Sequence, residues 1–323
     1  MNYLVTGGAG FIGSHLVRRL LESSEYNHVT VIDSLITGTV DNLPFHPRLI
    51  FRSLDVSDTQ WINNYASETI ADIQGLKIPD VIFNLACPAS PVSYQRNPIH
   101  TTLTSVMGAY HALLLAQRYK ARILQASTSE IYGDPTISPQ PEYYWGNVNS
   151  FGPRSCYDEG KRAAESLFYD FHKKFDVDIR LARIFNTYGP NMAVDDGRVV
   201  SNFVVQALKG ESITIYGDGR QTRSFCYVDD LVDGLLALSI SNCQEPVNLG
   251  NPIEFNMLDL AEMVLSITKS TSKIEYKSLP EDDPQQRRPN ISRARTLGWE
   301  PKVALQEGLE NTVEYFRRKL NNV

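Results

Sequence analysis

Residues 3–13 read YLVTGGAGFIG, and this stretch decides the fold of the chain. It opens with a short apolar strand, and a helical spacing of apolar side chains follows over residues 14–21. The loop between them fits both GxGxxG and GxxGxxG, with the glycines Gly7, Gly8, Gly10 and Gly13. Glycine lets a backbone turn tightly and approach a pyrophosphate, which then rests on the N-terminus of the helix. The stretch therefore predicts a strand, loop and helix that bind a dinucleotide.

An acidic residue follows the second predicted strand, residues 29–32, where such a site needs one. Asp33 lies 20 positions after Gly13, and a carboxylate at this spacing binds the hydroxyls of the adenosine ribose. The same carboxylate repels a 2′-phosphate, and residues 34–38 contain no arginine to offset that repulsion. We therefore expect NAD as the cofactor and not NADP.

Strands and helices continue to alternate through the first half of the chain. Further strands are predicted over residues 49–52, 81–84, 123–126 and 179–182. Helical patterns are predicted over residues 59–66, 101–119 and 157–175. Apolar strands that alternate with helices predict a parallel sheet covered on both faces. The predicted fold class is α/β, a Rossmann-type doubly wound parallel sheet, with residues 1–182 as the NAD-binding domain.

The second half of the chain has a looser pattern, with loops rich in Asn, Gly and Pro. Short strand-like elements are predicted at residues 212–217, 222–228 and 247–250, and amphipathic helices over 257–267 and 306–319. We expect residues 183–323 to form a smaller C-terminal lobe that binds the substrate. A segment near residues 224–238 is expected to return to the first domain.

The bulk composition fits a globular enzyme of 323 residues, long enough to bury a substantial core. The formal net charge of −6 gives no electrostatic reason to expect nucleic acid or an anionic membrane as a partner. No apolar run reaches the ~20 residues of a spanning helix. The chain starts directly on its first strand without a charged and apolar leader, so we expect a cytoplasmic location.

Neither cysteines nor histidines are arranged as metal ligands. The six histidines form no HxxxH or HExxH pattern. The four cysteines, which we expect to be reduced, lack metal-ligand spacing; they are Cys87, Cys156, Cys226 and Cys243. We predict no metal site.

Tyr157 and Lys161 stand four residues apart in SCYDEGK, residues 155–161. Positions i and i+4 of a helix share a face, so the phenol and the ammonium can point into one cleft. A neighbouring positive charge lowers the pKa of a tyrosine from its usual value of about 10, which suits a general base. Thr128 ends a predicted strand and would hold the substrate oxygen. The alternative is an amphipathic helix with a chance Tyr and Lys, but the glycine loop and Thr128 favour catalysis.

Asp55 follows the third strand, where an acid would meet the edge of an adenine ring. A solvated loop acid is the alternative interpretation of this residue. The residues that we expect at the cofactor are Gly7, Gly10, Phe11, Ile12, Gly13, Asp33, Asp55, Tyr157 and Lys161.

Several segments together resemble one enzyme family over nearly the whole chain. They are residues 7–13, 85–91, 127–135, 144–146, 154–162, 182–190, 196–203, 216–229 and 282–289. Their order resembles the extended short-chain dehydrogenase/reductase family, which acts on nucleotide sugars, and more narrowly its branch that decarboxylates UDP-glucuronate. Three positions depart from that pattern. Asn84 stands where the family has His, Thr39 where it often has Arg, and Asn290 where it usually has Asp. None is a reacting group, so the departures weaken only fine inferences about cofactor contacts.

The resemblance implies a reaction in three steps. Tyr157 takes the proton of the sugar 4-hydroxyl while hydride moves from carbon 4 to NAD⁺. The resulting ketone makes the carboxylate at carbon 5 a β-keto acid, which loses CO₂ and leaves an enolate. Protonation at carbon 5 and return of the hydride convert UDP-glucuronate into UDP-xylose and regenerate NAD⁺.

The two residues after Thr128 separate this reaction from those of the sister enzymes. The resemblance implies Asp-Glu there in 4,6-dehydratases and no acid in 4-epimerases, whereas this chain has Ser129 and Glu130. CO₂ leaves without a proton, so Glu130 can manage the ring and the carbon-5 proton. Arg287 matches the family arginine that binds the substrate carboxylate, a role that suits a guanidinium fork. The alternative for Glu130 is an acid at a strand end without a catalytic role. The alternative for Arg287 is a solvated position in the Arg-Arg run of residues 287–288.

The resemblance assigns further residues of the second half to the nucleotide. Arg223 would meet the diphosphate, Tyr216 the uracil face and Gln221 the ribose. Asn186 and Val200 would make backbone or amide contacts. A position in the hydrophobic core is the alternative for Tyr216 and Val200.

Two residues near the expected sugar complete the prediction. Tyr94 would reach the glucuronate, with an ordinary loop aromatic as the alternative. Arg154 is either a substrate contact or a member of a structural ion pair. The family likeness also implies a homodimer through the helices near 101–119 and 157–175, although a doubly wound sheet needs helices on both faces in any case.

Two other functions remain open. The chain could be a related enzyme of the same fold, namely a 4-epimerase, a 4,6-dehydratase or a decarboxylase of a dTDP-linked acid. It could also be a non-catalytic NAD-binding regulator. The presence of Thr128, Tyr157 and Lys161 together argues against a regulator, which has no need for all three.

Overall fold

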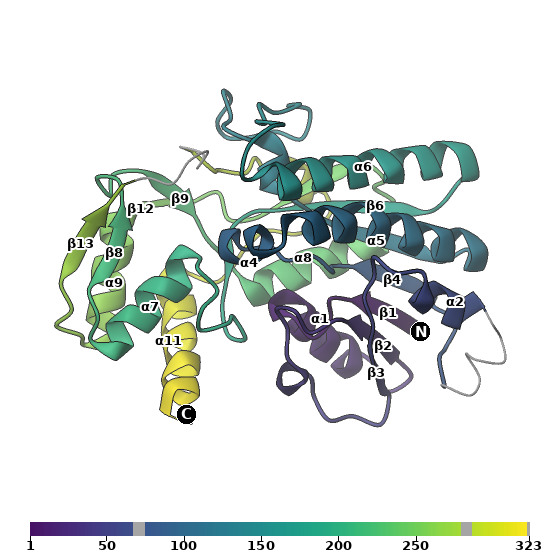
Figure 1. Ribbon diagram of the computed structural model, residues 1–323, viewed down its shortest axis with the longest axis horizontal. Helices are drawn as coiled ribbons and strands as arrows, with labels where there is room; N and C mark the ends of the chain where they lie inside the picture. Colours follow the sequence, from purple (N-terminus) through teal and green to yellow (C-terminus); the bar gives the residue numbers. More distant parts are fainter. Residues whose placement is uncertain (67–74, 279–285, 322–323) are drawn as a thin grey trace.

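The computed structural model describes residues 1–66, 75–278 and 286–321 (Figure 1). A seven-stranded sheet with the order β11-β6-β5-β4-β1-β2-β3 forms its centre, and all neighbouring strands are parallel. The strands are β1 (Asn2–Thr6), β2 (His28–Asp33), β3 (Leu49–Ser53), β4 (Val81–Asn84), β5 (Arg122–Thr128), β6 (Ile179–Ile184) and β11 (Pro246–Leu249). The α/β class and the doubly wound parallel sheet are confirmed. Of the family-like segment 282–289, residues 282–285 lie outside the described residues.

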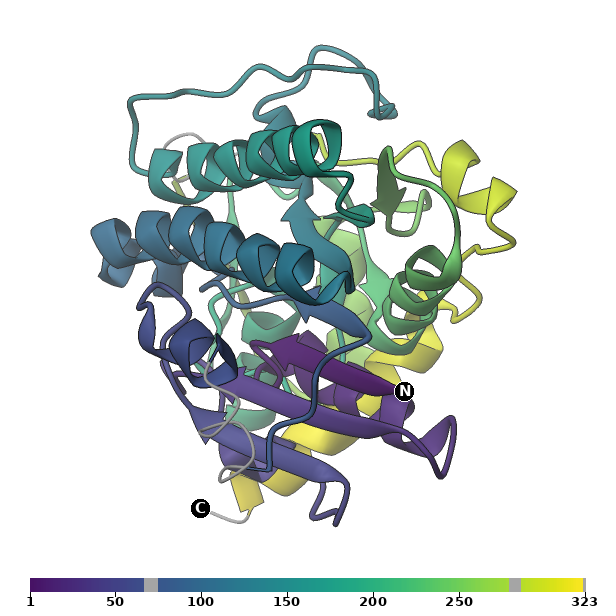
Figure 2. The ribbon, with the colours of Figure 1, turned by 90° about the vertical axis from the view of Figure 1, so that its right-hand side faces the viewer.

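Helices cover both faces of this sheet, as Figures 1 and 2 show. They are α1 (Phe11–Glu22), α2 (Gln60–Ala66), α4 (Pro91–Arg96), α5 (Pro98–Tyr119), α6 (Ser155–Phe175) and α8 (Val228–Ile240), with the 3-10 turns η1 (Val40–Asn42) and η2 (Ser129–Tyr132). The strands and helices predicted for the first half are all present, with their ends shifted by a few residues. Within the described ranges, no helix is both long and apolar enough to cross a lipid bilayer.

The alternation of side chains along the strands explains the two layers of helices. Val5 packs in one core with Val17 of α1, whereas its neighbour Leu4 packs in a second core with Ala112 of α5 and Phe168 of α6. Successive residues of a strand face opposite sides of a sheet. Strands that are apolar on both faces therefore need helices on both.

The second half contributes a smaller lobe, at the side of the sheet marked by β8, β9, β12 and β13 in Figure 1. Its strands are β7 (Thr187–Tyr188), β8 (Ile213–Tyr216), β9 (Thr222–Ser224), β10 (Cys226–Tyr227), β12 (Glu254–Asn256) and β13 (Ile274–Lys277). The further helices are α7 (Val199–Lys209), α9 (Met257–Thr268), α10 (Ser292–Thr296) and α11 (Leu305–Asn321). β8 pairs with β13 and β7 with β10 in parallel, and β9 pairs with β12 antiparallel.

The strand predicted at residues 247–250 does not belong to the smaller lobe, and that part of the prediction is wrong. β11 pairs with β6 in the main sheet, with Val247 opposite Ala182 and Leu249 opposite Ile184. Val247 and Leu249 are buried. A short apolar run predicts a strand but not its partner, because pairing between distant segments depends on how the whole sheet packs.

Helix α8 connects the lobe to the sheet. Its Leu231 and Leu235 lie in the same hydrophobic core as Val17 of α1 and Phe316 of α11. One continuous core thus runs from one face of the sheet into the lobe. The two parts of the molecule are therefore held together by buried apolar side chains.

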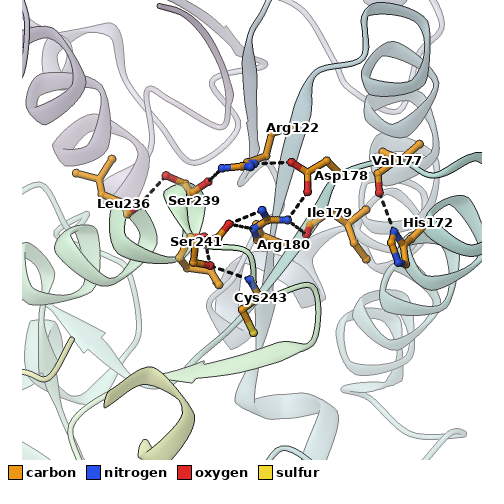
Figure 3. A network of polar contacts seen from close by, with 11 residues as sticks. Arg122, His172, Val177, Asp178, Ile179, Arg180, Leu236, Ser239, Ser241 and Cys243 are labelled. Atoms are coloured by element: carbon orange, nitrogen blue, oxygen red, sulfur yellow. Dashed lines mark hydrogen bonds and ion pairs between the residues drawn. The ribbon is translucent and has the colours of Figure 1, made fainter. Parts of the chain in front are cut away.

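Two arginines fix the C-terminal end of α8 to the amino ends of β5 and β6 (Figure 3). Arg122 donates from Nη1 to the carbonyl oxygen of Ser239 at 2.8 Å, and Arg180 donates from Nε to that of Ser241 at 2.9 Å. Both also bind Asp178, at 2.6 and 2.5 Å. The last carbonyls of a helix have no partner inside the helix, so these guanidinium groups satisfy them and complement the helix dipole. The network anchors α8 at the end of the sheet opposite to the carboxyl ends of its strands.

Candidate active site

A cavity of about 540 Å³ lies where the carboxyl ends of β1, β4, β5 and β6 meet the smaller lobe. Ligands of doubly wound sheets bind at this edge, because the loops that follow the strands part there. All the residues predicted at the cofactor, the reaction or the substrate line this one cavity. They are Gly7, Gly10, Phe11, Ile12, Gly13, Asp33, Asp55, Tyr94, Thr128, Ser129, Glu130, Tyr157, Lys161, Asn186, Val200, Tyr216, Gln221, Arg223 and Arg287. Their individual roles remain predictions.

The glycine loop packs so closely against the protein backbone that Gly7 and Gly13 have no room for a side chain. A Cβ on Gly13 would lie 2.1 Å from the carbonyl oxygen of Gly7, and one on Gly7 would lie 2.8 Å from the backbone of Ala86. Gly7 also has a φ of 70°, which glycine adopts without strain. α1 begins at Phe11, and Phe11 and Ile12 line the cavity, so the positive end of the helix dipole is available to a phosphate.

Asp33 is oriented by the glycine loop itself. Its Oδ2 accepts from the amide of Ala9 at 3.0 Å, and its Oδ1 accepts from the amide of Leu35 at 2.8 Å. Burial raises the pKa of Asp33, and hydrogen bonds from these backbone amides and that of Gly10 oppose the rise. The carboxylate therefore has a fixed position at the cavity, where the sequence predicts the adenosine ribose.

Asp55 is held by neighbouring side chains and is not a loosely solvated loop acid. Its Oδ2 lies 2.6 Å from Nε2 of His100, and its Oδ1 accepts from the amide and the hydroxyl of Ser57 at 2.8 and 2.7 Å. Burial by itself would raise the pKa of Asp55, but the hydrogen bonds from His100 and Ser57 outweigh burial and lower it. The carboxylate is thus presented to the cavity in its charged form.

Tyr157 and Lys161 are both buried on α6 and both line the cavity, as their spacing predicts. Nζ of Lys161 lies 5.7 Å from the centre of the Tyr157 ring and donates to the carbonyl oxygen of Ala126 at 2.9 Å. Burial raises the pKa of Tyr157, Cys87 adds to the rise, and a hydrogen bond with Thr128 opposes it. The predicted lowering of the tyrosine pKa is therefore wrong in direction for the chain by itself. Desolvation is the largest cause of the rise at Tyr157, and burial also lowers the pKa of Lys161 because it disfavours the charged form of both groups.

Glu130 lies in a buried ion cluster. Nη1 of Arg287 lies 2.8 Å from Oε1 of Glu130, and Nη2 donates to Oε2 at 3.0 Å. Nη2 of Arg154 also donates to Oε2, and Asn186 accepts from Nη1 of Arg287 at 3.5 Å. The side chains of Glu130, Arg154 and Arg287 are 9, 8 and 14% exposed, so salt and water screen their charges weakly. Arg287 is therefore not a solvated member of an Arg-Arg run, and Arg154 does form an ion pair.

Tyr94 links this ion cluster to Tyr157. The two rings are stacked, with centroids 5.0 Å apart and an interplanar angle of 5°. Cζ of Arg154 lies 5.9 Å from the centre of the Tyr94 ring. Tyr94 is buried, so it is part of the wall of the site and not a loose loop aromatic.

Asp158 is a buried acid behind this wall that the sequence does not single out. Its side chain follows Tyr157 on α6, and the residue is 6% exposed. Burial raises the pKa of its carboxyl to about 7, the charge of Glu130 adds to the rise, and the two arginines of the cluster oppose it. The one signal in the sequence for a charged and buried environment around Asp158 is its position one helical turn after Arg154.

The residues predicted at the nucleotide lie on the lobe side of the cavity. Tyr216 is 43% exposed and its carbonyl oxygen accepts from Nε2 of Gln221. Arg223 is buried and donates from Nη1 to the carbonyl oxygen of Thr222 at 2.9 Å. Val200 is buried in the first turn of α7, so its side chain is in the core while its backbone lies at the start of the helix. Tyr216 is not a core residue.

Several residues that line the cavity have no role in the sequence-based prediction, among them Arg198, Cys87 and His100. Arg198 binds Asp196 at 2.6 and 2.8 Å and lies with Cζ 5.5 Å from the centre of the Phe11 ring. Cys87 and His100 also line the cavity. Arg198 and Cys87 lie in family-like segments, so a comparison of those segments with the family, residue by residue, could have found them as site residues. His100 lies in none of these segments. Across residues 1–66, 75–278 and 286–321, no group of His, Cys, Asp or Glu side chains is placed to hold a metal ion.

Comparison with known proteins places this architecture in a family. The family model described as GDP-mannose 4,6 dehydratase matches residues 4–312. The chain therefore belongs to this family of extended short-chain dehydrogenases/reductases. Within it, the chain is similar to UDP-glucuronic acid decarboxylase 3 of Arabidopsis thaliana. The two are 52% identical over 325 residues, which cover 99% of this chain and 90% of the plant protein.

Two solved structures of the same fold carry related ligands. The UDP-glucose 4-epimerase of Thermotoga maritima, solved with UDP-glucose, has a TM-score of 0.89 and 32% identity, covering 99% of this chain and 100% of that one. The UDP-glucuronic acid 4-epimerase of Bacillus cereus was solved in complex with UDP-glucuronic acid and NAD. Its TM-score is 0.84 at 28% identity, again covering 99% of this chain and 100% of that one.

Proposed function

We propose that the chain decarboxylates UDP-glucuronate to UDP-xylose and CO₂, with NAD as a cofactor that is reduced and reoxidised in every turnover. The observation that carries the proposal is the pairing of Glu130 with Arg287 in the cavity that Tyr157 and Thr128 also line. Decarboxylation of a sugar acid needs a cation for the carboxylate, a base for the hydroxyl and a proton source for carbon 5. The identity of 52% with a UDP-glucuronic acid decarboxylase supports the same substrate.

The cofactor site supports NAD. When bound, NAD⁺ would accept a hydride from carbon 4 of the sugar and return it to the same carbon after CO₂ has left. The glycine loop and Asp33 would hold the pyrophosphate and the adenosine ribose, and Asp55 would meet the adenine edge. Tyr157 and Lys161 would contact the other end of the cofactor. The NAD bound to the Bacillus cereus epimerase supports this choice.

Tyr157 would act as the general base. It would take the proton of the 4-hydroxyl, while the hydroxyl of Thr128 holds the same oxygen. Burial raises the pKa of Tyr157 in the chain by itself, so the positive charges of Lys161 and of bound NAD⁺ would have to stabilise the phenolate before it accepts this proton. The proton then returns to the oxygen when carbon 4 is reduced, and Tyr157 is unchanged after a full turnover.

Arg287 and Glu130 would handle carbon 5. Arg287 would hold the substrate carboxylate with its guanidinium fork. The ketone lets the electron pair of the breaking carbon–carbon bond enter an enolate as CO₂ departs. Carbon 5 then takes one proton, so each turnover consumes one proton, and Glu130 would deliver it directly or through water. Ser129 lies beside Glu130 at the same wall of the cavity.

The lobe side of the cavity would hold the nucleotide. Arg223 would bind the diphosphate, Tyr216 the uracil face and Gln221 the ribose. Asn186 and the backbone at Val200 would complete these contacts. The bound UDP-glucose in the Thermotoga maritima epimerase supports a nucleotide sugar in this fold.

Product analysis tests the proposal. The chain is incubated with UDP-glucuronate and NAD⁺, the sugar nucleotide is examined by proton NMR, and released CO₂ is measured. We expect UDP-xylose and an equal amount of CO₂. The 4-epimer of UDP-glucuronate without CO₂ would assign a 4-epimerase instead, the activity named for the Bacillus cereus structure. Faster conversion of the dTDP-linked acid than of UDP-glucuronate would mean that the substrate carries dTDP and not UDP. Binding of NAD without conversion of either acid would indicate a regulator.

We also propose a homodimer that forms through α5 and α6, which lie side by side in Figure 2. Ile99, Leu103 and Tyr110 of α5 are 75, 46 and 37% exposed, and Tyr169 of α6 is 59% exposed. The three residues of α5 lie along one side of that helix, so the exposed apolar surface is continuous. Light scattering should give twice the chain mass of 36.3 kDa for the wild type and a monomer for Leu103→Glu combined with Tyr169→Glu. A monomeric wild type would contradict the proposal.

A further inference from the structure

Arg287 is already occupied in this structure, although the proposed function assigns it to the substrate. Both of its outer nitrogens bind the carboxylate of Glu130, at 2.8 and 3.0 Å. One guanidinium fork cannot hold two carboxylates in the same two-point manner. A substrate carboxylate that binds the same two nitrogens would therefore draw Arg287 away from Glu130, which is the residue expected to act next, at carbon 5.

Arg154 has the geometry to keep Glu130 in place during this exchange. Its Nη2 donates to Oε2 of Glu130, and its side chain is 8% exposed. Its backbone is fixed at the start of α6, where its carbonyl oxygen accepts from the amides of Tyr157 and Asp158 at 3.0 and 3.1 Å. Its guanidinium lies 5.9 Å from the centre of the Tyr94 ring. Arg154 is thus held by the same helix and the same aromatic stack as the base.

We propose that Arg154 is a positioning residue that keeps Glu130 at the carbon-5 side of the sugar when the substrate carboxylate takes Arg287. The inference rests on the proposed function, because it needs a ligand with a carboxylate. A buried carboxylate that loses all its charged partners is strongly disfavoured. Arg154 removes that obstacle, so Glu130 can release Arg287 without leaving its position.

The charges around Glu130 agree with such an exchange. Arg154 and Arg287 supply two positive charges to one carboxylate, and Asp158 is the second acid of the cluster, with Glu159 beyond it. Burial raises the pKa of Asp158, which favours its neutral form. Two guanidinium groups on one carboxylate leave Glu130 with a charged partner when a substrate carboxylate takes Arg287.

A binding cycle with two ligands tests this inference. Dissociation constants for UDP-glucuronate and UDP-xylose are measured by calorimetry on NAD⁺-loaded protein in a Tyr157→Phe background, which slows turnover by about 10²–10⁴-fold. UDP-xylose is the matched ligand because it lacks only the carboxylate. The variants are Glu130→Gln, Arg154→Met and the two combined. Methionine keeps the length and the apolar contact with Tyr94 while it removes the charge.

Arg154→Met should weaken the binding of UDP-glucuronate about ten- to a hundredfold and should change the binding of UDP-xylose little. The reason is that Glu130 then has Arg287 as its remaining partner in the ion cluster and retains it. Glu130→Gln should strengthen the binding of UDP-glucuronate, because the neutral glutamine side chain no longer competes with the substrate carboxylate for Arg287. In the double variant, the affinity for UDP-glucuronate should return to that of Glu130→Gln alone. This rescue is the decisive result, since a purely structural role for Arg154 predicts none.

Other results would overturn the inference. A loss in the double variant as large as that in Arg154→Met would mean that Arg154 binds the substrate itself. Equal losses for both ligands would mean that Arg154 supports the fold. If Arg154→Met does not fold, Arg154→Lys replaces it in the same cycle. We then expect a smaller loss of affinity for UDP-glucuronate, which Glu130→Gln should again remove. Failure of the proposed function would appear separately, as absence of CO₂ release by the wild type and no preference for UDP-glucuronate in the parent background.

Discussion

Glu130 and Arg287 form a two-point ion pair inside the cavity, although 157 residues separate them along the chain. Glu130 lies in η2, directly after β5, and Arg287 comes from the second half of the chain. The pair therefore exists only when the sheet and the lobe have folded together. It also gives Arg287 an internal partner that a substrate carboxylate has to replace.

The first prediction concerns Arg287. Arg287→Ala should weaken UDP-glucuronate about ten- to a hundredfold and UDP-xylose much less, because only the first ligand carries a carboxylate. Calorimetry with both ligands on NAD⁺-loaded protein measures this difference. Arg288→Ala is the matched control, since Arg288 has the same charge, does not line the cavity and has a side chain that is 43% exposed. An equal loss for both ligands would indicate a contact with the phosphates or a structural role.

The second prediction concerns the base. Tyr157→Phe removes the group that takes the 4-hydroxyl proton, so kcat for CO₂ release should fall by the ~10²–10⁴-fold that is typical of a lost general base. The affinity for NAD⁺ should change little, because the ring and its stack on Tyr94 remain. Tyr119→Phe serves as the control, since its hydroxyl donates to the carbonyl oxygen of Tyr65 outside the cavity. Turnover near the wild-type rate in Tyr157→Phe would assign the base elsewhere.

The third prediction concerns the choice of cofactor. The wild type should bind NAD⁺ more tightly than NADP⁺, because the carboxylate of Asp33 repels a 2′-phosphate. Asp33→Asn should reduce the ratio of NAD⁺ to NADP⁺ affinity by about tenfold or more, because the substitution removes a close charge–charge repulsion. Titration with both cofactors measures the ratio, and Asp41→Asn, an exposed acid outside the cavity, should leave it unchanged. NADP⁺ binding as tight as NAD⁺ binding in the wild type would refute the prediction.

The fourth prediction concerns Asp158 and pH. The pKa of its carboxyl rises from an ordinary 3.8 to about 7 in the folded chain, so the folded state binds more protons than the unfolded state between these pH values. The stability that this group contributes is therefore complete below pH 4 and is lost as pH rises towards 7. Asn does not titrate, so Asp158→Asn should gain stability relative to the wild type, by about 1–4 kcal/mol, as pH rises from 4 to 8.

Urea unfolding of both proteins at several pH values measures this gain. The difference between the two free energies of unfolding isolates Asp158, because the other titrating groups are common to both proteins. A difference that stays constant from pH 4 to 8 would show that Asp158 has the same pKa in the folded and unfolded chains.

Properties that depend on neighbours in the chain could be predicted from the sequence. The glycine loop, Asp33 and the alternation of strands and helices specify the parallel sheet, because helical and strand periods are set within a few residues. The spacing of Tyr157 and Lys161 likewise places both on one face of α6, as observed. The family-like segments identified further residues that line the cavity, among them Glu130, Arg223 and Arg287.

Properties that depend on burial and on distant segments were decided by the tertiary structure. β11 joins the main sheet beside β6, and a four-residue apolar run does not specify that partner. The pKa of Tyr157 rises instead of falling, because desolvation by the surrounding fold outweighs the hydrogen bond with Thr128. Glu130 meets Arg154 and Arg287 only in three dimensions, since an ion pair forms between whichever charges the folded chain brings together in a place that water does not reach.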